Sequence, residues 1–194
     1  MVAINTIGTK HASSTEATND AVHQLLDYLA TYPDDGILYR ASDMILVAQS
    51  DAGFHNESKG HSWAGAHIFL SEDDSIPHWN GPILTVDQII KFVLASAVEA
   101  ELRSLFITAQ KMVPLQQTLI EMGWPQKPSP GQSNNTTSEG VANGTIVANK
   151  LKSTDLRLHW LRCREARNQF HFYWYKGPNN WADHSNKHHP PVLY

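Results

Sequence analysis

The chain has 194 residues, of which 41% are hydrophobic and 18% charged, a composition typical of one globular domain of ordinary size with a short additional segment. Its 15 lysines and arginines stand against 19 aspartates and glutamates, a formal net charge of −4, which argues against a nucleic-acid binder held mainly by a strongly basic surface. The single cysteine, Cys163, excludes an intrachain disulfide and a cysteine-rich zinc cluster.

Targeting and membrane signals are missing from the pattern. Residues 1–10 contain no basic region followed by an apolar run, so we expect no signal peptide. No apolar stretch approaches the roughly 20 residues that span a bilayer. We therefore expect an intracellular location, in the cytoplasm or the nucleus, and no membrane partner.

The first part of the chain predicts one helix and then a break. Apolar residues recur at helical spacing over residues 15–31, and Pro33 with the turn-forming residues after it ends the pattern. This stretch is too small to form a domain by itself. We assign residues 1–42 to a helical connection segment that packs on the main domain, and residues 43–194 to that domain.

Three candidate strands follow. Residues 44–49 form a short apolar run that stops at a polar, turn-prone stretch, and residues 62–70 and 76–84 have similar length and character. Short polar loops separate the three. This arrangement predicts an antiparallel meander.

The second half of the chain alternates helices and strands. Residues 96–112 predict a long helix, and Pro114 stands at the start of a second helix over 115–122. The polar residues 126–144 predict a surface loop, although 131–135 leave room for a short strand. The remaining elements expected are a basic amphipathic helix over 154–167, an aromatic strand over 170–175 and a short polar helix or turn over 180–187. The whole order predicts an α/β domain with a mixed sheet.

Three acidic residues stand where they can bind hard divalent cations, which take carboxylate oxygens. Asp51 follows the first strand, Glu101 lies in the long helix among apolar neighbours, and Asp183 begins the last short helix. Taken singly, each is more often a solvated charge or a helix cap.

Four motifs, in order, carry a resemblance to a known family. They are Ser50-Asp51-Ala52, the helix start SAVEAEL at 96–102, KSTDLRLHWLR at 152–162, and Trp181-Ala182-Asp183 with Lys187. They resemble the motifs of the ribonuclease H domain in polyproteins of copia-type retrotransposons. Residues 22–39 are similar to the connection between reverse transcriptase and ribonuclease H in that family, so the resemblance covers nearly the whole chain.

The resemblance implies a ribonuclease H-like α/β fold, a five-stranded mixed sheet with helices on both faces, which cleaves the RNA strand of an RNA–DNA hybrid with two Mg²⁺ or Mn²⁺ ions. It implies that Asp51 bridges both ions, that Glu101 rather than Glu99 binds one, and that Asp183 binds the other. The implied partners are the hybrid and the reverse transcriptase of the same polyprotein. Arginines of the basic helix are candidate contacts to hybrid phosphates, with a solvated helix face as the alternative: Arg157, Arg162 and Arg164.

The third acid of the family is missing. Its motif T-D-N-x-[ST]-A corresponds to residues 133–138, where Asn134 stands in place of the aspartate. Decay of a genomic copy and a deliberate substitution both account for this. One charge pair at about 4 Å is worth on the order of 4 kcal/mol at an effective dielectric constant of 20. We therefore expect weakened ion binding and impaired cleavage, unless a neighbour such as Glu139 substitutes.

Two alternatives to an enzyme stay open at this point. The first is a catalytically inactive hybrid-binding or interaction module, a decayed or repurposed retroelement fragment, which Asn134 favours. The second is a zinc site built on His184, His188 and His189, since positions four apart share a helix face. For these histidines a structural or surface role is the simpler interpretation. Cys163 has no evident base partner and is expected to be an inert thiol.

Overall fold

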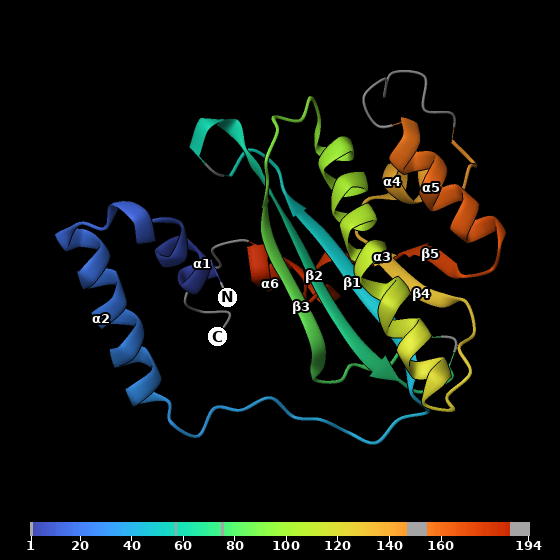
Figure 1. The fold of residues 1–194 in the computed structure, drawn as a ribbon, viewed down its shortest axis with the longest axis horizontal. Coiled ribbons are helices and arrows are strands. Elements are labelled where there is room, and N and C mark those ends of the chain that lie inside the picture. The colour runs from blue at the N-terminus through green and yellow to red at the C-terminus, as the bar shows by residue number, and fades with distance from the viewer. Residues whose placement is uncertain (1, 57, 75, 147–154, 187–194) are drawn as a thin grey trace.

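The computed structural model describes residues 2–56, 58–74, 76–146 and 155–186 of the chain (Figure 1). The helices are α1 (Val2–Thr9), α2 (Glu16–Thr31), α3 (Ala97–Glu121), α4 (Thr136–Ala142), α5 (Asp155–Ala166) and α6 (Asp183–Asn186), with short 3-10 helices η1 (His11–Ser13), η2 (Ser58–Gly60) and η3 (Gly177–Asn179). The strands are β1 (Ile45–Gly53), β2 (Ser62–Ser71), β3 (Pro82–Ile90), β4 (Ser129–Ser133) and β5 (Phe170–Trp174).

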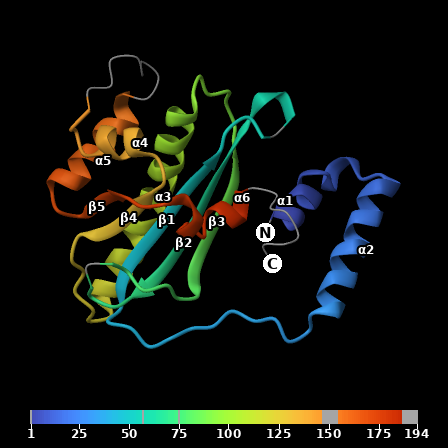
Figure 2. The ribbon, with the colours of Figure 1, turned by 180° about the vertical axis from the view of Figure 1, so that it is seen from behind.

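The strands form one mixed sheet of five, in the order β3-β2-β1-β4-β5. β1 pairs antiparallel with β2, and β2 with β3, while β4 runs parallel to both β1 and β5. The long helix α3 covers one face, and α6 lies on the opposite face, which Figure 2 turns toward the viewer. The predicted five-stranded mixed sheet with helices on both faces is confirmed.

The main core lies between the sheet and the helices α3, α4 and α5. Its largest fully buried side chains include Leu46 and Ile68 from the sheet and Leu102 and Met112 from α3. The backbone N–H of Glu99 donates to the Ser96 hydroxyl at 3.2 Å, which caps the first turn of α3. The capped, apolar-faced helix is thereby held against β1 and β2.

Helix α3 is one continuous element from Ala97 to Glu121, so the prediction of two helices separated at Pro114 is wrong. Pro114 is exposed, and a carbonyl that loses its N–H partner at such a place can bond to water. Met112 and Leu119, on either side of the proline, are both buried. Burial of this apolar stripe keeps the chain helical through the proline.

Three other predicted boundaries are wrong. The first strand is β1, which runs to Gly53, whereas the sequence pattern ended it before Ser50, so Asp51 lies inside the strand. The third strand is β3, which begins at Pro82, whereas the sequence pattern placed it over 76–84. Residues 126–144 contain β4 and α4, so the prediction of one continuous loop is wrong, and the alternative of a short strand over 131–135 overlaps β4 with a shift of two residues. Helix α4 begins where the side-chain oxygen of Asn135 accepts a hydrogen bond from Ser138 N at 3.0 Å, a regular N-terminal cap.

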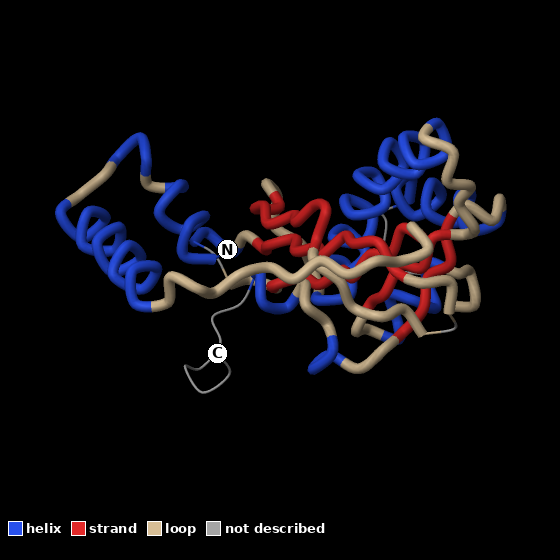
Figure 3. The backbone as a smooth tube through the Cα atoms, turned by 90° about the horizontal axis from the view of Figure 1, so that it is seen from below, coloured by secondary structure: helices blue, strands red, loops and turns tan. Residues whose placement is uncertain are grey.

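The N-terminal segment lies partly on the domain and partly away from it. Helix α1 contacts β3 and α6, whereas α2 packs on α1 and stands clear of the sheet in two views (Figures 1 and 3). The chain then returns along the edge of the sheet, where Gly81 N donates to Leu38 O at 3.1 Å and Arg40 N to Asn80 Oδ1 at 2.8 Å. The division of the chain at residue 42 stays a prediction. Within the described ranges, none of the helices combines the length and the apolar character that crossing a bilayer requires.

Candidate active site

Asp51 lies near the end of β1 and its side chain is fully buried. In the sheet register it stands opposite Gly65 of β2, which stands opposite Asp87 of β3. Side chains alternate along a strand, and the hydroxyl of Ser50 contacts α3 through Ser104 Oγ at 3.0 Å. Asp51 is therefore directed toward the other face of the sheet, where α6 lies.

Helix α3 is fixed directly against the backbone of Asp51. The Ser104 hydroxyl donates to Asp51 O at 2.6 Å and also approaches Gly65 O at 3.2 Å. Glu101, only 8% exposed, precedes Ser104 by three residues, and residues at this spacing share a helix face. Glu101 and Asp51 thus lie at the same end of the sheet.

The residues before α6 are tied to β1 by hydrogen bonds. The buried Asn180 donates its side-chain N–H to Ser50 O at 2.8 Å, and Trp181 N donates to Gln49 Oε1 at 2.8 Å. Asp183, half-buried, follows at the start of α6 and donates its backbone N–H to Asn180 O at 3.1 Å. These bonds bring the start of α6 to the same part of β1 from the other side of the sheet.

Asn134 comes directly after β4, the strand parallel to β1. Its side-chain Nδ2 donates to Asp51 Oδ1 at 2.6 Å, and its backbone carbonyl accepts a hydrogen bond from Trp174 Nε1 at 3.1 Å. The residue at the predicted third acid position therefore contacts the predicted first acid directly. It does so as a hydrogen-bond donor.

The described residues do not fit a preformed pair of divalent ions. No three histidine, cysteine, aspartate or glutamate side chains among them gather closely enough to hold a metal ion. An amide N–H cannot ligate a cation, and the N–H of Asn134 is the group that faces Asp51. Glu139, the expected substitute, accepts a hydrogen bond from Asn143 Nδ2 at 2.6 Å instead. The assignments of Asp51, Glu101 and Asp183 as ligands stay predictions.

The three arginines predicted to contact phosphates make different contacts within the domain. Arg162 donates to two backbone carbonyls, Val141 O at 2.9 Å and Ile146 O at 3.1 Å, which joins α5 to the end of α4 and to the residues after it. Arg164 donates to Gln169 Oε1 at 2.6 Å. Arg157 packs over an aromatic ring. A structural role thus accounts for Arg162, and the phosphate role of all three remains a prediction.

The predicted zinc site can be followed only in part, because His188 and His189 lie outside the described residues. The ring of His184 packs near that of Trp181, with 6.0 Å between centroids. The free thiol of Cys163 is exposed.

Sequence reasoning missed the polar groups that position the acids. Ser104 and Asn180 are both buried, and each bonds to the backbone of β1. For Ser104 a signal was present, since it follows Glu101 by one helical turn. For Asn180 none was present, because its place in a polar turn is typical of a solvated residue.

Comparison with known proteins agrees with the architecture. No family model matches the chain. Among solved structures, LC11-RNase H1, isolated from compost by a metagenomic approach, matches with a TM-score of 0.56 and 12% identity over 74% of this chain and 93% of that one. A structure of LC11-RNase H1 in complex with an RNA/DNA hybrid matches with a TM-score of 0.52 and 13% identity, over 73% and 93%. The fold defines a ribonuclease H-like domain.

One curated relative is similar in sequence. The retrovirus-related Pol polyprotein from transposon TNT 1-94 of Nicotiana tabacum is 24% identical over 143 residues, which cover 74% of this chain and 10% of that polyprotein. The chain thus spans about a tenth of the relative that it matches. The chain thus has a ribonuclease H-like fold, and its sequence is similar to part of a retroelement polyprotein.

Proposed function

We propose that this chain is a ribonuclease H-like domain that binds RNA–DNA hybrids and cleaves them weakly or not at all. The hydrogen bond of 2.6 Å from Asn134 Nδ2 to Asp51 Oδ1 carries the second half of the proposal. The first half is supported by the fold, which is similar to that of a protein solved in complex with an RNA/DNA hybrid.

The chemistry of Asn134 explains the expected loss. A carboxylate at this position adds a negative charge and two acceptor oxygens toward a cation, whereas the amide adds no charge and presents its N–H to Asp51. At an effective dielectric constant of 20, one charge pair at about 4 Å is worth on the order of 4 kcal/mol. Losing even half of that slows a reaction by more than about tenfold.

The proposal also includes the domain that neighbours this one in the polyprotein. Since the curated relative is a Pol polyprotein about ten times as long as the matched region, we place the domain next to a reverse transcriptase of copia type, with residues 1–42 as the connection. Helix α2 stands clear of the sheet and exposes Leu26 and Leu29, as a segment that packs on a neighbouring domain would.

A cleavage assay tests the enzymatic half. The chain is incubated with an end-labelled RNA–DNA hybrid and Mg²⁺ or Mn²⁺, beside the variants Asn134→Asp and Asn134→Asp with Asp51→Asn. We expect little or no cleavage by the wild type, a gain of at least tenfold in Asn134→Asp, and loss of that gain in the double variant. Wild-type cleavage as fast as that of Asn134→Asp contradicts the proposed role of Asn134.

A measurement of hybrid binding distinguishes the proposed function from a second candidate, an inactive interaction module with no affinity for nucleic acid. Fluorescence anisotropy with a labelled hybrid, in EDTA to prevent cleavage, measures affinity directly. Binding of the hybrid in preference to a DNA duplex of the same sequence supports the proposal. Equal or undetectable binding of both duplexes favours the interaction module.

A further inference from the structure

Two arginines from different helices share one aromatic ring at the surface. The guanidinium carbon of Arg103 in α3 lies 5.0 Å from the ring centroid of Phe92, and that of Arg157 in α5 lies 5.2 Å from the same centroid. Arg103 also lies 5.3 Å from the centroid of Phe106. The ring of Phe92 thus contacts two cations.

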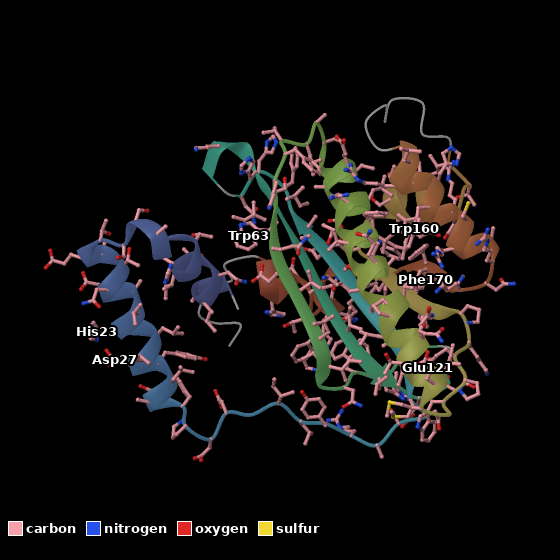
Figure 4. All side chains as sticks on the ribbon, in the orientation of Figure 1. His23, Asp27, Trp63, Glu121, Trp160 and Phe170 are labelled. Carbon is pink, nitrogen blue, oxygen red and sulfur yellow. The ribbon has the colours of Figure 1, made fainter. Side chains whose placement is uncertain are left out.

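Further contacts between aromatic rings and arginines follow along the contact between α3 and α5. Phe106 meets Trp160 edge-on, with 5.3 Å between centroids and 75° between planes, and Arg164 lies 4.9 Å from the Trp160 centroid. Figure 4 shows Trp160 between the two helices. Rings and cations therefore hold α3 and α5 in a fixed relation, and with them Arg103 and Arg157.

The positive charge of this pair is not balanced within the described part of the chain. Nε and Nη1 of Arg103 are buried there and have no hydrogen-bond partner, and the ion pairs found among the described residues involve neither Arg103 nor Arg157. Burial, and then the charge of Arg157, lower the pKa of Arg103 from its ordinary value. Two adjacent cations of this kind favour an anion beside them.

The pair lies at the Asp51 end of the sheet. Arg103 follows Glu101 by two residues on α3. Phe92 follows β3 by two residues, and Asp87 of that strand aligns with Asp51 across β2. The Phe92 side chain is 40% exposed and both arginines are half-buried, so the pair meets solvent, although Nε and Nη1 of Arg103 do not.

We infer that Arg103 and Arg157, both held at the ring of Phe92, bind a backbone phosphate of a nucleic-acid strand that enters the candidate active site. A planar guanidinium can donate two N–H groups to one phosphate. The ring of Phe92 orients the guanidinium groups of both arginines before the ligand binds. With a net charge of −4 the chain as a whole repels a polyanion, so binding depends on such local cations. This inference rests on the proposed function.

Binding of the full chain to fluorescently labelled duplexes tests it. The variants are Arg157→Gln and Arg103→Gln, with Arg103→Lys to keep the charge, and Lys111→Gln is the matched control, because Lys111 is an exposed cation two turns farther along α3. We expect each glutamine variant at Arg103 or Arg157 to weaken hybrid binding about threefold to tenfold and to lower the slope of log affinity against log salt by about 1. Lys111→Gln is expected to leave the affinity and its salt dependence nearly unchanged. Arg103→Lys is expected to keep most of the slope of log affinity against log salt.

The outcomes separate this inference from the proposed function. Hybrid binding that Arg157→Gln weakens no more than Lys111→Gln overturns the phosphate site and leaves the proposed function standing. Duplexes bound through the arginine pair without preference for the hybrid uphold the site and contradict the proposed function. Undetectable binding of every duplex overturns both. Circular dichroism of each variant checks the fold, and Arg157→Gln alone decides the matter if Arg103→Gln does not fold.

Discussion

The side-chain amide of Asn134 donates to Oδ1 of the fully buried Asp51 at 2.6 Å, so a neutral donor from the end of β4 contacts a carboxylate at the end of β1. A buried carboxylate that accepts such a bond is stabilised without a cation. A second carboxylate in place of the amide would have the opposite effect, because two like charges would then be close together in a poorly solvated place.

We predict that Asn134→Asp lowers stability and makes it depend on divalent ions. Loss of a hydrogen bond to a buried carboxylate costs about 2 kcal/mol, which lowers the melting temperature of a chain this long by about 4–8 °C in EDTA. Millimolar Mg²⁺ should recover part of the loss in the variant and leave the wild type unchanged. Thermal unfolding followed by circular dichroism measures both, and equal ion dependence of the two proteins contradicts the prediction.

Asn180→Ala is predicted to loosen α6 from the sheet. Asn180 is 2% exposed, donates to Ser50 O at 2.8 Å and accepts a bond from Ala182 N at 3.1 Å, so its removal takes two hydrogen bonds from buried backbone groups. The expected loss of stability in denaturant unfolding is about 1–3 kcal/mol. Asn19→Ala, at an exposed position of α2, is the control and is expected to stay within about 0.5 kcal/mol of the wild type. Similar losses in both variants would show that the buried bonds of Asn180 contribute little.

Strand β4 is an element that its own residues do not favour. Its residues, Ser-Pro-Gly-Gln-Ser, are typical of a turn, yet the strand lies between β1 and β5 in the middle of the sheet. A β-carbon at Gly131 would lie 2.8 Å from Cδ1 of Phe172, so the small residue serves close packing. Pairing on both sides determines this strand, which local propensity left only as an alternative over 131–135.

The sequence motifs pointed to the acids of the candidate site, but they did not predict how these acids contact their neighbours. The apolar runs of β1 and β5 and the order of the four motifs were sufficient to predict the sheet, while the roles of Asp51 and Glu101 stay predictions. Nothing local indicated that the Asn134 amide would donate to Asp51, because that contact joins residues 83 positions apart. Contacts of this kind follow from the pairing of β1 with β4.

Asp87→Asn is predicted to stabilise the protein at neutral pH. Burial raises the pKa of the Asp87 carboxyl above its ordinary value of 3.8, partly offset by the side-chain hydrogen bond from Asn5. A raised pKa means that the folded state binds the proton more tightly, so this contribution to stability is present below pH 3.8 and is lost as the pH rises through the raised pKa. The variant should therefore melt a few degrees higher than the wild type at pH 7, and the difference should shrink toward pH 4.

The exposed Asp27 of α2 provides the control for that experiment, since Figure 4 shows it on the helix that stands away from the sheet. Asp27→Asn should leave the difference in melting temperature between pH 4 and pH 7 unchanged. If Asp87→Asn melts below the wild type at pH 7, the hydrogen bond with Asn5 outweighs the cost of burying the charge.

His67 is predicted to make stability fall in mild acid. Burial lowers the pKa of His67 from its ordinary value of 6.5, outweighing the effect of the bond between Nε2 and Asn80 O at 3.1 Å, which the neutral ring makes as an N–H donor. The ring also packs against Trp181, with 6.0 Å between centroids. A lowered pKa means that the unfolded state binds the proton more tightly, so this contribution is complete above pH 6.5 and is lost as the pH falls through the lowered pKa.

His67→Gln keeps a donor for Asn80 O and removes the titration. It should melt a few degrees below the wild type at pH 8, because the packing of the ring is lost, and the gap should narrow or close by pH 5. His23→Gln, at an exposed position of α2 that Figure 4 labels, is the matched control for replacing a histidine and should melt with the wild type. Thermal unfolding between pH 8 and pH 5 measures all three proteins. A gap between His67→Gln and the wild type that stays constant over this range would mean that His67 does not couple protonation to folding.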